Sequence, residues 1–259
     1  MSGRVDAAHM DLGTILSIWA HPDDETYLAG GVMASATDRG QRVVCVSLTA
    51  GEHGTQDPAV WPPTRLARVR GWEAAAAMAV LGVRDHRILG FPDGEVTAHE
   101  EIAEEAVERL VDEVRPDTIV TFGPDGVTFH PDHMAVHRIV TRAWERAGRR
   151  ARLLYATPTV EHLARFGSLY DELGVYMTDA RPDGATADQI AVHLVLEGAG
   201  LDRKLTALRA LASQTSGTIE ALDLDAYSAQ IAEEAFVDAD TLSSPWSPQR
   251  AEVSSERAA

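Results

Sequence analysis

The chain is short of cysteine, of positive charge and of long apolar runs. Its single cysteine, Cys45, excludes an internal disulfide, and its apolar neighbours indicate a small core residue. Lysine and arginine number 23 against 40 aspartates and glutamates, and the net charge of −17 argues against nucleic acid or an anionic membrane as a partner, because both require a basic surface. No run approaches the ~18 apolar residues of a membrane span, and the N-terminus lacks the apolar core of a signal peptide. We therefore expect a cytoplasmic protein that binds neither nucleic acid nor a membrane.

Two kinds of segment alternate over the first 156 residues. Continuous apolar runs are typical of strands that are buried on both faces, and the segments between them have helical spacing and helix stop signals. This alternation predicts an α/β fold, with a Rossmann-like, mostly parallel sheet flanked by helices and a less regular part from about residue 158. The predicted strands are 14–20, 42–49, 86–91, 117–123, 151–157 and 190–198, and the predicted helices are 27–40, 64–83, 97–116, 131–148, 201–214 and 224–236.

One domain accounts for most of this pattern. We expect it to span residues 11–236, because no segment is long and irregular enough to serve as a linker to a second domain. The final segment is rich in serine, proline and charge, so we expect loose termini at 1–10 and 237–259. Thr97 and Glu100 form the pattern of a capping box and predict the start of the helix over 97–116.

Acids and histidines follow each of the first four predicted strands. The four loops that carry them lie at 21–25, 49–53, 91–95 and 123–133. Because the carboxyl ends of parallel strands meet at one edge of a sheet, where ligands bind, we expect these side chains to converge. Burying so many ionisable groups together is costly unless another charge neutralises them.

A divalent metal would neutralise this cluster. His21 and Asp24 lie three residues apart on one turn, and His133 completes a set of two histidines and one carboxylate. Three protein ligands with water in the fourth position are a usual catalytic zinc site, in which the ion lowers the pKa of its water towards ~7. Asp23 is then free to act as general base, and Asp132 or another acid is placed to orient a histidine from outside the metal shell.

The motif AHPDDE at 20–25, joined to HPDH at 130–133, resembles the LmbE-like (PIG-L-type) zinc N-deacetylases. The resemblance runs from about 14 to 214. It implies removal of an acetyl group from an N-acetylated amino sugar or a related small molecule, with zinc or another divalent transition metal as cofactor, and it leaves a homo-oligomer open. It also implies His21, Asp24 and His133 as ligands, Asp23 as general base, His130 as the group that stabilises the oxyanion or protonates the amine, and Arg70 and Asp93 as residues that contact the substrate or order the site.

The sequence departs from this family at two positions. Phe129 stands where the family usually has glycine, and we expect its side chain to narrow or reshape the entrance to the site. Thr128 stands where the mycothiol deacetylase has a tyrosine that helps to polarise the carbonyl group. The tyrosine donor that polarises the carbonyl in that relative is therefore missing from this chain.

Alternative interpretations remain for several of these residues. The 21–25 segment alone is also typical of a polar turn in which Asp23 or Asp24 caps a helix. Two histidines and one carboxylate also form the facial triad of non-haem iron oxygenases, and a non-catalytic carbohydrate-binding relative would keep the same fold. We expect His162 on the surface and His193 as a structural residue of an apolar strand.

Overall fold

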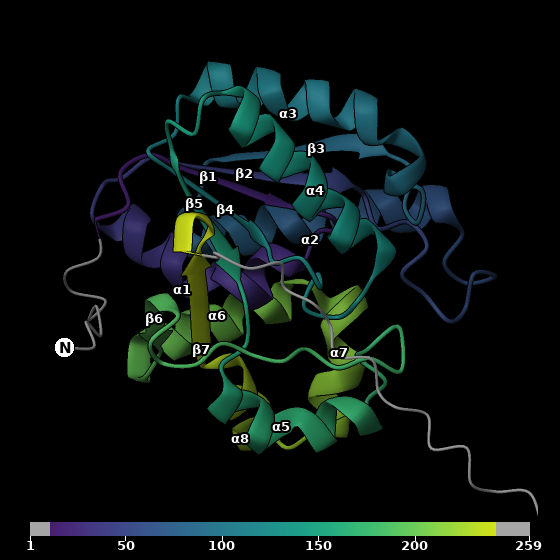
Figure 1. Ribbon diagram of the computed structural model, residues 1–259. Coiled ribbons are helices and arrows are strands. Elements are labelled where there is room, and N and C mark those ends of the chain that lie inside the picture. Colours follow the sequence, from purple (N-terminus) through teal and green to yellow (C-terminus); the bar gives the residue numbers. More distant parts are fainter. Residues whose placement is uncertain (1–10, 242–259) are drawn as a thin grey trace, which may run out of the picture.

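Seven strands form one sheet within residues 11–241, the part of the chain that the computed structural model describes (Figure 1). They are β1 (Ile15–Trp19), β2 (Val43–Thr49), β3 (Asp85–Phe91), β4 (Thr118–Phe122), β5 (Arg152–Ala156), β6 (Ile190–Val195) and β7 (Glu233–Asp238). Their order is β3-β2-β1-β4-β5-β7-β6. The first five strands pair in parallel, and β7 pairs antiparallel with both β5 and β6. The predicted Rossmann-like, mostly parallel sheet is therefore confirmed.

Helices cover both faces of this sheet. The helices α1 (Asp24–Asp38), α2 (Pro63–Leu81) and α6 (Gly198–Ala210) pack together on one face, and α3 (Glu100–Val114) and α4 (Pro131–Arg146) pack together on the other (Figure 1). Because helices lie on both sides, every residue of β1, β2 and β4 is buried. The remaining helices, α5 (Val160–Glu172), α7 (Ala212–Ala221) and α8 (Leu224–Ile231), lie beyond the edge of the parallel strands.

The order in which successive strands are added to the sheet reverses between β1 and β4, which are parallel neighbours at the centre of the sheet. From β1 the chain builds outward through β2 to β3, and it then returns to the other side of β1 for β4 and β5. In open α/β sheets such a reversal leaves a crevice at the carboxyl ends of the two central strands, where ligands bind. The helices α1 and α4 begin at this crevice, so the first turn of each helix is presented there.

Several elements differ from their prediction. The predicted capping box is wrong, because α3 begins at Glu100 and a 3-10 helix over Val96–His99 precedes it. The N-cap residue of α3 is His99, and its side chain makes no capping hydrogen bond. The sequence does not reveal α5, and the predicted helix over 224–236 divides into α8 and β7. Residues 237–241, expected to belong to a loose terminus, lie in β7 and a short 3-10 helix. The other expected loose segments, 1–10 and 242–259, fall outside the described residues.

The described helices include none that is both long and apolar enough to cross a bilayer.

A buried ion pair joins α1, α6 and β7. Lys204 and Glu234 have no exposed side-chain surface, and their Nζ and Oε1 atoms lie 2.7 Å apart. Glu234 accepts hydrogen bonds from the backbone N–H groups of Gly31 and Val32, and Lys204 donates one to the carbonyl of Tyr27. The pair therefore fixes the middle of α1, whose first turn reaches the crevice.

We expect Lys204→Met to lower the free energy of unfolding by about 3–5 kcal/mol, because it leaves Glu234 buried without its cation. Urea unfolding followed by circular dichroism measures this loss. Arg203→Met is the matched control on the same helix, since Arg203 pairs with Asp38 at the surface, and its loss should stay near 1 kcal/mol. Equal losses in the two variants would show that the buried pair is not a structural anchor.

Candidate active site and metal centre

The predicted metal ligands come together at the crevice between β1 and β4. His21 and Asp24 belong to the turn that joins β1 to α1, and His133 lies in the first turn of α4. His21 Nδ1 is 3.2 Å from His133 Nε2, His133 Nε2 is 3.3 Å from Asp24 Oδ1, and His21 Nδ1 is 3.5 Å from Asp24 Oδ2. A tetrahedral zinc ion with bonds of about 2.0–2.1 Å holds its ligand atoms about 3.3 Å apart. The three side chains therefore match the donor types and the spacing of such a site.

The charges around these ligands also fit a cation. Burial lowers the pKa of His133 to about 4, so its imidazole is neutral and keeps a lone pair for a metal. Burial opposes ionisation of Asp24, yet His133 and His21 hold its pKa well below the ordinary range. Burial also opposes the charged form of His21, but Asp132, Asp24 and Asp93 together raise its pKa well above the ordinary value. The carboxylates thus favour positive charge at this point.

His133 is oriented by a loop with unusual backbone geometry. Its Nδ1 donates a hydrogen bond of 2.9 Å to the carbonyl of Gly126, which leaves Nε2 to face His21 and Asp24. Gly126 has a φ of 62°, and a Cβ atom added there would lie 2.6 Å from the Cβ of His133. Two independent reasons therefore favour glycine at position 126: the backbone conformation and the close approach of His133.

Asp23 lies beside the ligands and contacts Arg70. Its Oδ2 is 3.2 Å from the Arg70 guanidinium, which also donates hydrogen bonds of 2.9 Å to the carbonyls of Gly51 and Pro22. Burial raises the pKa of Asp23 to about 6, against the opposing effect of Arg70. A carboxylate with that pKa can accept a proton near neutral pH. Arg70 is only 3% exposed, so its observed contacts order the site, and the predicted contact with substrate stays a prediction.

The two remaining aspartates face the other side of the His21 ring. Asp93 Oδ1 lies 3.0 Å from His21 Nε2, and Asp132 Oδ2 lies 3.5 Å from the same atom. Asp132 also accepts hydrogen bonds from the backbone N–H groups of Gly94 and Val96, which ties the β3 loop to α4. The structure thus places Asp93 nearer than Asp132, the acid expected to orient a histidine, to the His21 ring, and the substrate contact predicted for Asp93 stays a prediction.

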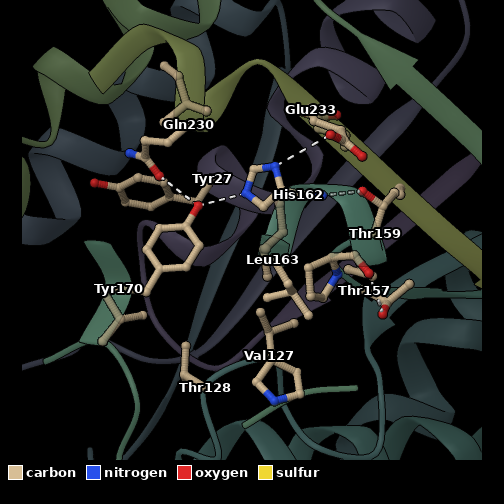
Figure 2. A pocket seen from close by; sticks show the side chains of 18 of the residues that line it. Tyr27, Val127, Thr128, Thr157, Thr159, His162, Leu163, Tyr170, Gln230 and Glu233 are labelled. Carbon is tan, nitrogen blue, oxygen red and sulfur yellow. Dashed lines mark hydrogen bonds and ion pairs between the residues drawn. The ribbon is translucent and has the colours of Figure 1, made fainter. Parts of the chain in front are cut away.

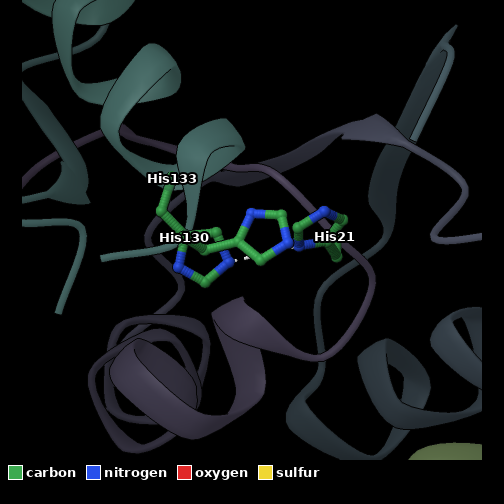
Figure 3. A group of neighbouring side chains, drawn as sticks. All are labelled: His21, His130 and His133. Atoms are coloured by element: carbon green, nitrogen blue, oxygen red, sulfur yellow. Dashed lines mark hydrogen bonds between the residues drawn. The ribbon is translucent and has the colours of Figure 1, made fainter. Parts of the chain in front are cut away.

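His130 is the N-cap residue of α4. Its Nδ1 accepts a hydrogen bond of 3.1 Å from the backbone N–H of Asp132, so in the neutral ring Nε2 carries the proton. Burial lowers the pKa of His130, which favours this neutral form. Its ring centroid lies 4.8 Å from those of both His21 and His133 (Figure 3). His130 therefore offers an N–H donor close to the candidate metal ligands.

Further residues lie close to this centre. Glu25, fully buried, accepts a hydrogen bond from the backbone N–H of Asp23, and burial raises its pKa to about 8. A cavity beside the ligands is lined in part by His162, whose side chain is only 10% exposed, so its predicted surface position is wrong. Phe129 is buried and lies outside the lining of that cavity, contrary to its expected place at the entrance. The apolar spacing of Leu163 and Phe166 was the available signal for α5.

We expect Gly126→Ala to weaken metal binding by about 10- to 100-fold, because the new methyl group displaces His133 and its supporting carbonyl. Competition with a chromogenic chelator measures the affinity. Gly148→Ala is the matched control, since Gly148 also has a positive φ, of 76°, but has open space where a Cβ would lie. Unchanged affinity in Gly126→Ala, or an equal loss in both variants, would argue against a metal ligand role for His133.

Relatives with a known activity match more than half of this chain. A 1D-myo-inositol 2-acetamido-2-deoxy-alpha-D-glucopyranoside deacetylase of Acidothermus cellulolyticus is 30% identical over 232 residues, which are 78% of this chain and 79% of the relative. A deacetylase of the same name from Saccharomonospora viridis is 36% identical over 174 residues, 58% of this chain and 65% of the relative. The match thus spans slightly less than two thirds of that second relative.

Solved structures share the fold. The N,N'-diacetylchitobiose deacetylase of Pyrococcus horikoshii aligns with a TM-score of 0.63 and 22% identity, over 88% of this chain and 84% of that one. The model of the GlcNAc-PI de-N-acetylase family, PIG-L, matches residues 16–144, which contain all the candidate ligands. The resemblance carried by the AHPDDE and HPDH motifs is therefore confirmed, and this chain belongs to the PIG-L family.

Proposed function

We propose that this chain is a metal-dependent N-deacetylase that removes the acetyl group from an N-acetylated amino sugar or a related small molecule. The observation that carries the proposal is the convergence of His21 Nδ1, Asp24 and His133 Nε2 within 3.2–3.5 Å of one another, beside the carboxylate of Asp23, which Arg70 holds. The names of the relatives support it, because each is called a deacetylase of an acetamido sugar or of diacetylchitobiose.

His21, Asp24 and His133 are the proposed ligands of a divalent ion, which we take to be zinc or another transition metal in its place. The chemistry that such an ion supplies is Lewis acidity, which polarises an amide carbonyl and lowers the pKa of water. Asp93 and the Gly126 carbonyl hold the two histidine rings in the orientation that this role requires, since each faces the ring nitrogen opposite the ligand atom.

The residues of the chain then divide the proton transfers of amide hydrolysis. Asp23 takes a proton from the attacking water, and Arg70 keeps its carboxylate in place. The Nε2–H group of His130 is a donor for the negative charge that develops on the carbonyl oxygen. Asp23, which now carries the proton of the water, delivers it to the leaving nitrogen as the carbon–nitrogen bond breaks, so that the products are acetate and the free amine; His130 would take this role only in its doubly protonated form.

An iron oxygenase would use the same types of ligand. Membership of the PIG-L family favours hydrolysis, and the two reactions differ in what they consume. Release of acetate and amine in equal amounts without oxygen supports the hydrolase, whereas a requirement for oxygen supports the alternative. A carbohydrate-binding protein without turnover would release neither product.

The adjacent aspartates should respond differently to the same substitution. We expect Asp24→Asn to lose both metal and activity, because it removes a charged ligand. Asp23→Asn should keep the metal and lose about 10²–10⁴ in kcat, because only the base is removed. Elemental analysis after dialysis against a weak chelator, together with kcat, separates the two. Metal loss in Asp23→Asn with retention in Asp24→Asn would mean that their roles are exchanged.

Removal of the metal should abolish deacetylation and lower the melting temperature. The stabilisation lost is about 4 kcal/mol where the ion is present at 1,000 times its Kd. A strong chelator followed by gel filtration gives the metal-free protein, and addition of zinc or cobalt should restore both properties. Full activity in protein shown by elemental analysis to be metal-free would rule out the proposed mechanism.

A further inference from the structure

A cavity of about 310 Å³ opens directly against two of the candidate metal ligands, Asp24 and His133. Its walls come from α1, α5, α8 and β7 and from the loop before α4 (Figure 2). This volume is at the lower end of the range for small-molecule sites. Many of its walls are apolar or aromatic side chains, among them Leu28, Val127, Leu163, Val175, Tyr170 and Tyr176.

Four polar side chains at one end of this cavity, those of His162, Tyr170, Gln230 and Glu233, are already paired with protein groups. His162 Nε2 lies 2.7 Å from the Tyr170 hydroxyl, which donates a hydrogen bond to Gln230. Glu233 lies 3.4 Å from His162 Nδ1. It also lies 3.1 Å from the Nε2 atom of His193, a residue that does not line the cavity. Figure 2 shows this chain of contacts at one end of the cavity and Leu163 and Val127 towards the other.

A hydroxyl-rich group would be bound poorly in such a place. Each hydroxyl that leaves water needs a new partner, and a partner already engaged must give up the bond that it has. An apolar group loses nothing by leaving water and gains about 0.8 kcal/mol for each buried methylene, which is about fourfold in binding. The pairing of the polar groups and the apolar walls thus favour the same kind of occupant.

We infer that this cavity binds an apolar group of the substrate, aliphatic or aromatic, while the amide lies at the metal centre. The inference rests on the proposed function, because it assigns the amide of an N-acetylated or N-acylated amine to the ligands that the cavity adjoins. The apolar group has two possible sources, a longer acyl chain or an aglycone attached to the amino sugar. Both sources share one chemistry, and two substrate series distinguish them.

The first test measures kcat/KM with substrates that lengthen on one side only. One series is the methyl, butyl and hexyl glycosides of N-acetylglucosamine, and the other is N-acetyl-, N-butanoyl- and N-hexanoylglucosamine. We expect kcat/KM to rise about fourfold for each methylene in one series. A glycoside or an acyl group of equal length that carries hydroxyls should show no rise. The inference is overturned if both series are flat, or if the hydroxylated compounds gain as much.

Substitutions within the cavity test its location. Leu163→Asn and Val175→Asn each place an amide on its wall and should flatten the dependence on chain length. Val160→Asn is the matched control on α5, since Val160 is 41% exposed and lies outside the cavity lining, and it should keep the full dependence. An unchanged dependence in both Leu163→Asn and Val175→Asn, with folding verified by urea unfolding, places the apolar group elsewhere and overturns the inference.

Binding without turnover separates this inference from the proposed function. The free amines of the glycoside series, and the carboxylates of the acyl series, are the reaction products and cannot be deacylated. Calorimetry should show tighter binding of hexyl than of methyl compounds in the series that fills the cavity. Tighter binding of the hexyl compounds by a protein that shows no deacetylase activity would reject the proposed function and leave the cavity inference standing. Deacetylation with no preference for apolar groups in either kinetics or binding would reject the cavity inference alone.

Discussion

Charge compensation at the crevice between β1 and β4 is the constraint on which the rest of the structure depends. Asp24, Asp93 and Asp132 surround His21 there, and all of them are largely removed from water. Carboxylates in such a place need cations or hydrogen-bond donors. The fold supplies backbone N–H groups to Asp93 and Asp132, which lie behind His21. Asp24 accepts one backbone N–H, that of His21, and faces two imidazole nitrogens, and this is the place where the proposed divalent ion would complete the balance.

The supports of this centre come from distant parts of the chain. Arg70 of α2 holds Asp23, and the Gly126 carbonyl holds His133. Helix α1, which begins with Asp24, is fixed in its middle by Glu234 of β7 and Lys204 of α6. A displacement of any of these elements would move a candidate ligand or the candidate base, so the less regular part of the chain also supports the candidate metal centre.

The sequence was sufficient for most of the parallel sheet and for the loops whose acids and histidines meet at its edge. Continuous apolar runs identify buried strands locally, and the AHPDDE and HPDH motifs identify the loops. Contacts between loops are different, because no local signal tells that Asp93 lies nearer than Asp132 to His21. The strand β7 was missed for a related reason. Its residues continue an apolar helical pattern, and only pairing with β5 and β6 makes them a strand.

The loop before α4 shows how a local irregularity connects the two halves of the site. Val127 and Phe129 have φ values of 65° and 59°, a conformation that costs roughly 1–2 kcal/mol in a residue other than glycine. The positive φ explains why glycine suits the position of Phe129. The same backbone conformation directs the Phe129 side chain to its buried position. The same turn points the Gly126 carbonyl at His133 and leaves Val127 and Thr128 on the cavity wall. The strain is therefore located where one short segment orients a candidate metal ligand and also shapes the space beside it.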